Sequence, residues 1–202
     1  DNFSIFWDNA YACHDIDETI QQTPADQIAK GLGLEDNLFQ VGSTSKITLA
    51  GSGISFISSS TENLSKFIDF RNAITPGPNK MNQGMHVKYF ESVSIEQQMN
   101  ELKKIIKPKF ELVDDILKPL KDSGLCSYEK PTGGYFYSID SAKSNADEIV
   151  QNCSDLGLKL LPMGSCFPYG KDPDKKNIRL APTFPDLASL ERCVSIFKNV
   201  LK

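Results

Sequence analysis

Gly42-Ser43-Thr44-Ser45-Lys46 is the stretch on which the interpretation of this chain depends. One lysine follows three hydroxyl side chains, and the apolar residues Ile47, Leu49 and Ala50 come after it. Residues 37–61 contain no acidic side chain that could pair locally with the lysine. A lysine that forms an imine must be partly deprotonated, through burial or nearby positive charge. Taken alone, however, the segment favours a surface lysine in a Ser/Thr loop.

A second polar segment follows the first apolar run of the chain. Phe3-Ser4-Ile5-Phe6-Trp7 is typical of a strand buried on both faces of a parallel sheet, and Asp8-Asn9-Ala10-Tyr11 comes directly after it. A carboxylate at the carboxyl end of a parallel strand lies where α/β sheets place ligands. The simpler alternative is that Asp8 caps a loop and Tyr11 packs beside it.

The third segment is Asn177-Ile178-Arg179-Leu180, in strand-like surroundings. An arginine between apolar residues is expected to be partly buried and therefore paired. Only three of the 22 basic residues are arginines, and the guanidinium group is the side chain suited to bidentate carboxylate recognition. The pattern is compatible with a ligand-binding arginine and equally with a structural ion pair.

Composition excludes several classes of function. A net charge of -4 argues against a nucleic-acid surface, and we find no apolar run long enough for a membrane span and no signal-peptide pattern. Five scattered cysteines without a CxxC pair indicate reduced thiols, and two histidines cannot build a metal centre, so we expect a cytoplasmic protein. Because the chain starts at an apolar strand without an initiator Met, we expect a fragment or truncated chain.

The periodicity of apolar residues predicts helices and strands in both halves. We expect helices at 24–32, with Thr23 as N-cap, and at 61–73. We also expect a helix from the Ser94/Gln97 capping box with a kink or an interruption at Pro108, one from Ser144 to the stop at Gly157, and one after an Asp186 cap. Expected strands are 39–41, 54–57, 135–139, 158–161 and 178–180. The Pro- and Gly-containing stretch 75–79 is the predicted domain boundary, which separates residues 1–75 from residues 76–202.

The three segments, in this order, resemble the fold-type-I pyridoxal-phosphate (PLP) enzymes of aminotransferase class I/II. In that family an Asp-x-x-Tyr precedes a Ser-x-Ser-Lys, and an Ile-Arg-Leu lies near the C-terminus. Pro131-Thr132-Gly133-Gly134-Tyr135-Phe136 is similar to the family's Pro-x-Gly-Gly-x-Phe strand entry. Residues 44–51, 79–83 and 86–88 look closest to the MocR-like or aspartate-aminotransferase-like subgroup. The chain thus resembles the C-terminal half of such an enzyme: an α/β remnant of the large PLP-binding domain (1–75), then a small α+β domain of helices on a small sheet (76–202).

The resemblance implies a role for each matching residue in binding PLP. Lys46 would be the Schiff-base lysine, which forms the internal aldimine and later moves the proton between Cα and the cofactor. Asp8 would pair with the protonated pyridine nitrogen and Tyr11 would hydrogen-bond the 3-oxygen. Ser43 and Ser45 would contact the phosphate.

The resemblance also implies the reaction and its partners. Arg179 would hold the substrate α-carboxylate, and an amino group would pass from an amino acid to a 2-oxo acid. A homodimer is expected because the family's active sites lie between subunits, and no nucleic-acid or membrane partner is expected. The side-chain preference of the substrate is not indicated, because neither Arg71 nor Arg192 matches the context of the arginine that selects aspartate.

Two departures from the family pattern change these expectations. Gly51-Ser52-Gly53 stands where the family usually has a phosphate-binding arginine after the lysine. Family members are about twice as long, and their N-terminal half carries a glycine-rich helix start that holds the phosphate, an aromatic residue that stacks on the ring and an Asn at the 3-oxygen. We therefore expect residues 1–75 to fold poorly alone and the chain to have little or no activity alone.

Three other interpretations fit the same motifs. The chain could belong to the effector domain of a MocR-type transcription regulator, which senses PLP instead of using it for turnover. It could come from a lyase or decarboxylase on the same scaffold. It could also be a folded C-terminal domain without a function of its own.

Overall fold

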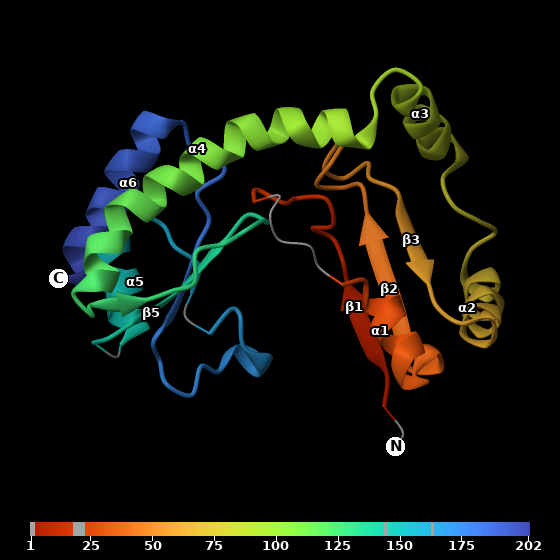
Figure 1. The fold of residues 1–202 in the computed structure, drawn as a ribbon, viewed down its shortest axis with the longest axis horizontal. Helices are drawn as coiled ribbons and strands as arrows, with labels where there is room; N and C mark the ends of the chain where they lie inside the picture. Colours follow the sequence, from red (N-terminus) through yellow and green to blue (C-terminus); the bar gives the residue numbers. More distant parts are fainter. Residues whose placement is uncertain (1–2, 18–22, 144, 163) are drawn as a thin grey trace. The chain divides into compact units, whose positions relative to one another are not determined.

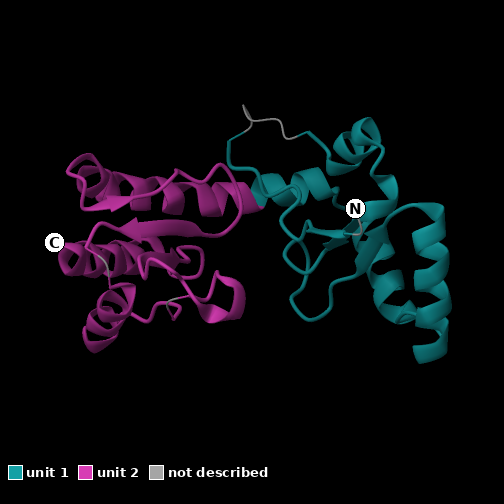
Figure 2. Cartoon of the chain, turned by 90° about the horizontal axis from the view of Figure 1, so that it is seen from below, with its two compact units in different colours: residues 1–101 teal, residues 102–202 magenta. Residues whose placement is uncertain are grey.

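The computed structural model describes residues 3–17, 23–143, 145–162 and 164–202. The chain divides into two units, each with more contacts inside it than outside, shown in teal and magenta in Figure 2. Unit 1 comprises residues 1–101 and unit 2 comprises residues 102–202. Each unit has its own three-stranded sheet and is described separately.

The sheet of unit 1 contains β1 (Ile5–Asp8), β2 (Leu38–Ser43) and β3 (Ser55–Ser58) in that spatial order (Figure 1). β1 runs parallel to β2, with Asp8 opposite Val41, and β3 runs antiparallel to β2. The strands predicted at 39–41 and 54–57 are therefore confirmed. β1 lies at an edge of this sheet and β2 at its centre.

The prediction that the first strand is buried on both faces is wrong for this chain. All four residues of β1 are exposed, and the side chains of Phe6 and Trp7 remain 71% and 45% accessible. The Phe6 ring stacks on Phe39 of β2 with a centroid distance of 5.0 Å. Apolar composition makes a strand suitable for burial, but burial itself requires packing partners on each face, and β1 is paired along one edge only.

Two predicted helices of unit 1, at 24–32 and 61–73, are confirmed, and a further helix at residues 80–90 was not predicted. α1 spans Ala25–Leu32, a 3-10 turn η1 covers Glu35–Asn37, α2 spans Thr61–Ile74 and α3 spans Lys80–Phe90. Thr23 is not the N-cap of α1: the cap position is Pro24, whose backbone is extended and whose ring offers no hydrogen bond. α2 and α3 have side-chain caps, in which Ser60 accepts from the Asn63 amide and Asn79 accepts from the Asn82 amide.

The longest helix, α4, spans Ile95–Asp122 and contributes to both units. Its predicted capping box is confirmed, because Gln97 N donates to Ser94 Oγ at 3.0 Å and Ser94 N donates to Gln97 Oε1 at 2.9 Å. Pro108 does not interrupt the helix, contrary to one form of the prediction. The proline removes one backbone hydrogen bond, while an apolar stripe that continues past it, including Phe110 and Val113, stays buried and holds the helix in place.

Unit 2 places helices on an antiparallel sheet. The strands are β4 (Cys126–Ser127), β5 (Tyr137–Ser141) and β6 (Asn177–Leu180), in that order, and the remaining elements are α5 (Ala146–Asp155), η2 (Pro168–Gly170) and α6 (Leu187–Leu201). Residues 158–161 form no strand, because unlike β6 they have no ladder partner along β5. The predicted helix start at Ser144 lies outside the described residues, whereas Gly157 follows α5 with a positive φ of 86°.

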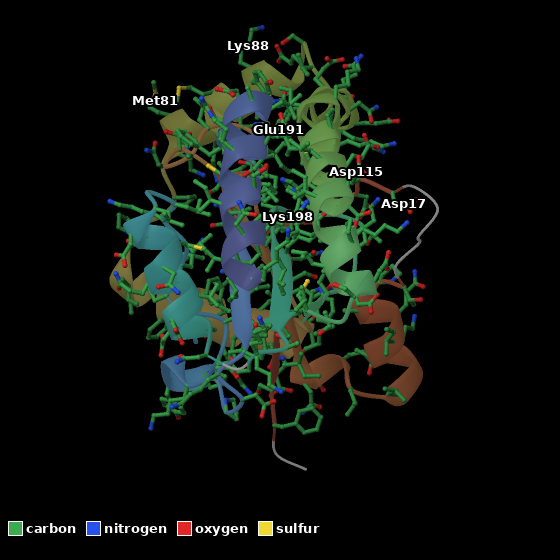
Figure 3. The ribbon with its side chains drawn as sticks, turned by 90° about the vertical axis from the view of Figure 1, so that its left-hand side faces the viewer. Asp17, Met81, Lys88, Asp115, Glu191 and Lys198 are labelled. Atoms are coloured by element: carbon green, nitrogen blue, oxygen red, sulfur yellow. The ribbon has the colours of Figure 1, made fainter. Side chains whose placement is uncertain are left out.

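The core of unit 2 lies between its sheet and its helices. Its fully buried side chains come from every layer of the unit: Phe110, Val113, Leu117, Tyr137, Ile139, Cys153, Ile178, Val194 and Phe197. Asp186 caps α6 as predicted, since its Oδ1 accepts from the Ser189 amide at 2.7 Å. Glu191 of α6 and Asp115 of α4, labelled in Figure 3, are exposed on the polar sides of these helices. Unit 2 therefore combines helices with a small antiparallel sheet, which is an α+β arrangement.

The division at residue 101 differs from the break at 75–79, which lies between α2 and α3. Contacts between α3, the first turns of α4 and the loop after β2 keep residues 80–101 with unit 1. The domain boundary at 75 thus stays a prediction. Among the described residues, no helix combines the length and the hydropathy that a membrane crossing requires.

Candidate functional site

The candidate site lies at the end of the unit 1 sheet where the parallel strands β1 and β2 finish. Asp8 is the last residue of β1, opposite Val41 of β2, and the Asn9 amide donates to the Val41 carbonyl at 2.8 Å. The loops that carry Tyr11 and Lys46 therefore leave the sheet side by side. The Asp8 carboxylate is exposed there and accepts a hydrogen bond from the Ala10 amide at 3.1 Å.

Two hydroxyl groups meet at the end of β2. Ser43 Oγ and Ser45 Oγ are 2.7 Å apart, and the Ser45 amide donates to Ser43 Oγ at 3.0 Å. The backbone of Gly53 passes so close that a Cβ atom there would lie 2.3 Å from Ser45 Oγ and 2.6 Å from Ser45 N. Any side chain at position 53, including the arginine typical of the family pattern, would displace this serine.

Lys46 lies in a tight turn of residues 44–48 and is exposed. The turn closes through the Ile47 and Thr48 amides, which donate to the Thr44 carbonyl at 2.9 and 2.8 Å. Thr44 itself is buried and extends the sheet, since its amide donates to the Ile54 carbonyl and its Oγ1 accepts from the Ile54 amide. The lysine side chain is thus presented from a turn whose base is fixed to the neighbouring strand.

His14 links the Tyr11 loop to the Lys46 turn. Its ring is buried and packs edge-on against Tyr11, with 5.5 Å between centroids. Nδ1 lies 3.0 Å from the Ala12 carbonyl oxygen, and Nε2 lies 3.3 Å from the Lys46 carbonyl oxygen. Sequence reasoning considered His14 only as a metal ligand and missed this contact. The only signal in the sequence was its position three residues after Tyr11.

A second buried histidine supports the turn from α3. His86 Nδ1 is 2.9 Å from the Asn82 carbonyl oxygen, which can only accept, so Nδ1 donates and Nε2 accepts. The Thr44 and Thr48 hydroxyls lie 3.1 and 2.9 Å from that Nε2. In the sequence this histidine stood out only as one of two histidines and as part of a family motif, and its buried role follows from the tertiary contacts.

Gln98, from the first turn of α4, contacts the same loop. Its Nε2 donates to the Ile47 carbonyl at 3.2 Å, and its Oε1 accepts from the Tyr89 hydroxyl at 2.7 Å. The Gln98 and Tyr89 side chains border a pocket of about 470 Å³ lined by Thr48, Leu49, Asn82, Met85, His86 and Gln98, among others.

The predicted site residues of unit 1 all lie at the end of the sheet where β1 and β2 finish: Asp8, Tyr11, Ser43, Ser45 and Lys46. The side chains that support them there were not apparent from the sequence.

Arg179 belongs to unit 2, where it lies on β6 opposite Ser138. Its guanidinium carbon is 3.4 Å from the centre of the Phe136 ring, a cation–π contact. The arginine also lines a largely apolar pocket of about 520 Å³ together with Leu160, Leu161 and Phe184. A cation at the wall of an apolar pocket is suited to a ligand that has a carboxylate and an apolar part.

The described residues contain no candidate metal-binding cluster, and burial makes the thiol of one cysteine unreactive. Within the described ranges, no group of three or more His, Cys, Asp and Glu side chains is arranged to hold a metal ion. The five cysteines are free, and burial raises the pKa of the Cys153 thiol to about 11. A buried thiol of this kind is a packing residue and not a nucleophile.

Comparison with known proteins gives a consistent result. The model of the family described as "Aspartate amino-transferase" matches residues 1–201. A Mycolicibacterium smegmatis protein provisionally described as an aminotransferase is 38% identical over 196 residues, which are 96% of this chain and 46% of that protein. The aspartate aminotransferase of Corynebacterium glutamicum is 35% identical over 94% of this chain and 45% of its own length. The chain spans about half the length of the curated relatives it matches.

Solved structures agree with these sequence matches. The crystal structure of an aspartate transaminase from Corynebacterium glutamicum superposes with a TM-score of 0.91 at 33% identity, covering 98% of this chain and 48% of that one. The α-aminoadipate aminotransferase of Thermus thermophilus, solved with N-(5'-phosphopyridoxyl)-L-leucine, has a TM-score of 0.81 at 16% identity, over 98% of this chain and 50% of that one. The second match shows a shared fold.

Proposed function

Because this chain belongs to the aspartate aminotransferase family, we propose that the intact protein containing it uses PLP to transfer an amino group between an amino acid and a 2-oxo acid. The observation that carries this proposal is the convergence of Asp8, the Ser43/Ser45 hydroxyl pair and Lys46 at the carboxyl edge of two parallel strands. Such an edge is where α/β sheets bind their ligands.

The donor set fits PLP. Ser43 and Ser45 offer two adjacent hydroxyls for the phosphate, and the missing side chain at Gly53 leaves the Ser45 amide and hydroxyl unobstructed by a Cβ. A carboxylate at Asp8 suits a protonated pyridine nitrogen, and the Tyr11 hydroxyl suits the 3-oxygen. When bound, PLP supplies an electron sink for reactions at the substrate Cα.

The chain's own residues would do the remaining work. Lys46 would provide the amine that holds the cofactor and that later carries the proton to and from the substrate carbon. Arg179 would fork onto the α-carboxylate and orient the substrate, with the Phe136 ring fixing the direction of the guanidinium. We further propose a cytoplasmic location, which accords with five free cysteines, and a homodimer, which the resemblance to the family implies.

The proposal is tested by mapping the PLP attachment site in the intact protein. Reduction with borohydride in the presence of PLP, followed by peptide mapping, should place the label on Lys46. Lys46→Ala should lose the label and any amino transfer, whereas Lys66→Ala, at an exposed lysine paired with Glu62 on α2, should change neither. Label on another lysine, or on none, contradicts the proposal.

A measurement of turnover distinguishes a PLP enzyme from a PLP-sensing regulator that has the same residues. Label on Lys46 with measurable transfer from an amino acid to a 2-oxo acid supports the enzyme. Label on Lys46 without transfer to any 2-oxo acid favours a PLP-sensing regulator or another PLP reaction. The 202-residue chain alone should show little transfer, since it spans about half the length of its relatives.

A further inference from the structure

We propose that His14 and Gln98 are positioning residues that clamp the backbone of the Lys46 turn from two sides. The inference rests on the proposed function, because it concerns the lysine to which PLP would attach. The two side chains come from segments 84 residues apart in the chain and bind consecutive carbonyl groups. Neither side chain is itself assigned a contact with the cofactor, and His14 reaches the site through its packing against Tyr11.

The need for a clamp follows from the turn itself. Within residues 44–48 the amides of Ile47 and Thr48 both donate to the Thr44 carbonyl, which satisfies the donors of the turn. The carbonyl groups of Lys46 and Ile47 face outward instead, because a single turn offers no amide to pair with them. The Lys46 carbonyl oxygen lies 3.3 Å from His14 Nε2, which donates to it when that ring nitrogen carries a proton, and the Ile47 carbonyl accepts from Gln98 Nε2 at 3.2 Å.

Each clamp residue is in turn fixed by a second contact. His14 is only 5% exposed and its ring packs edge-on against Tyr11. Its Nδ1 lies 3.0 Å from the Ala12 carbonyl oxygen, so donation to Ala12 and to Lys46 together requires a proton on both ring nitrogens. A change in the Tyr11 loop would therefore reach the Lys46 peptide through one imidazole. The Gln98 amide cannot rotate freely, because its Oε1 accepts from the Tyr89 hydroxyl, which leaves Nε2 to face Ile47.

Such a clamp matters because of the length of the lysine side chain. Lysine has a flexible four-carbon stem, and its amine can be aimed only if the backbone that carries it is held still. A displacement of about 1 Å at a reacting group can lower a rate on the order of 100-fold. Peptide planes held on both sides of Ile47 limit the rotation of the Lys46 Cα, and so they restrict where its amine can point.

Two pairs of substitutions in the intact protein test the clamp. His14→Asn removes the donor at the Nε2 position, whereas His14→Gln keeps a donor near it. Gln98→Glu keeps the acceptor for Tyr89 and loses the donor to Ile47. Gln97→Glu makes the same change of charge one residue earlier and keeps its bond to the Ser94 amide, so it is the matched control.

The first readout is hydrogen exchange in the cofactor-free protein. His14→Asn and Gln98→Glu should speed exchange of the Ile47 and Thr48 amides about two- to tenfold, the effect of losing one hydrogen bond. His14→Gln and Gln97→Glu should leave exchange within about twofold of the parent protein. Unchanged exchange in both donor-deficient variants overturns the clamp, whether or not the protein binds PLP.

The second readout is the rate at which borohydride traps PLP on Lys46. Both donor-deficient variants should trap on the order of 10-fold more slowly, and His14→Gln should recover most of the rate. If the parent protein carries no label on Lys46, the proposed function fails while the exchange result still stands. The positioning role is wrong if His14→Asn and Gln98→Glu trap PLP at the parent rate. It is also wrong if their slower trapping is explained by a general loss of stability, seen as a lower Tm with unchanged exchange at Ile47 and Thr48.

Discussion

The two units differ in the interactions that stabilise them. Unit 2 closes a core in which Tyr137, Ile139 and Phe197 have no accessible surface, so apolar burial holds it together. In unit 1 the strand residues Phe6 and Phe56 remain 71% and 63% accessible, and a network of hydrogen bonds from side chains to backbone shapes the loops. The candidate cofactor residues lie in the less buried unit, and the candidate substrate arginine lies beside the well-packed core.

The largest difference between the two halves of the chain should appear when each is expressed alone. Residues 76–202 expressed alone should fold and unfold cooperatively, since they contain the whole core of unit 2. Residues 1–75 alone should lack a cooperative transition. Circular dichroism during urea unfolding measures both. A cooperative transition from 1–75 would contradict the expectation that this part folds poorly alone, and the absence of one from 76–202 would contradict the proposed boundary.

A large-to-small substitution in each unit should have very different effects. Phe197→Ala removes a fully buried ring and should cost about 3–5 kcal/mol of unfolding free energy. Phe6→Ala, at an exposed ring that stacks on Phe39, should cost about 1 kcal/mol or less. Trp7 is the single tryptophan and lies in unit 1, so its fluorescence follows that unit while circular dichroism follows both. Equal costs would contradict the difference in burial between the two units.

Glycine substitutions test the tight contact at the candidate site. Gly53→Ala should cost about 1–3 kcal/mol and weaken PLP binding, because its Cβ would meet the Ser45 backbone. Gly84→Ala, in the middle of α3 with nothing within 4 Å of its new Cβ, should stabilise unit 1 by about 0.5–1 kcal/mol. Equilibrium unfolding with Trp7 fluorescence and PLP titration report the two effects. A neutral Gly53→Ala would show that the loop gives way easily.

A single hydroxyl tests the core of unit 2. The Tyr137 hydroxyl donates to the Phe110 carbonyl at 2.9 Å, and burial raises the pKa of this phenol well above its usual range. Tyr137→Phe should cost about 1 kcal/mol, the net value of one such bond. Tyr169→Phe, whose side chain is 97% exposed, is the matched control and should be neutral. Urea midpoints by circular dichroism decide whether the bond stabilises the unit.

The smallest expected effect is confined to acidic pH. Hydrogen bonds from the Asn177, Lys176 and Asp174 amides hold the pKa of the Asp172 carboxyl below 3.8. A lowered folded-state pKa stabilises the fold above 3.8, and this contribution is lost as pH falls through the folded-state value. Asp172→Asn should therefore flatten the dependence of the unit 2 midpoint on pH below about 4, whereas Asp174→Asn, at an exposed neighbour, should not.

Much of the local structure was predictable because it depends on short-range chemistry. The capping box at Ser94/Gln97 and the Asp186 cap follow from side chains that bond amides three residues away. Strand pairing was less accessible: residues 158–161 have strand-like composition but no ladder partner, and the two-residue β4 carries too little pattern to be noticed. Helix α4 continues through Pro108 because distant packing outweighs one lost bond.

For the candidate site, the sequence by itself determined which chemical groups are present and in what order. Asp8, Tyr11, Ser43, Ser45, Lys46 and Arg179 follow the pattern of a family to which the chain belongs. Only the tertiary structure decided how they are held. Parallel pairing of β1 and β2 brings Asp8 beside the Lys46 turn, and His14, His86 and Gln98 bind that turn through contacts 32 to 51 residues apart in sequence. Contacts of that range depend on the folded backbone, and no local pattern of residues encodes them.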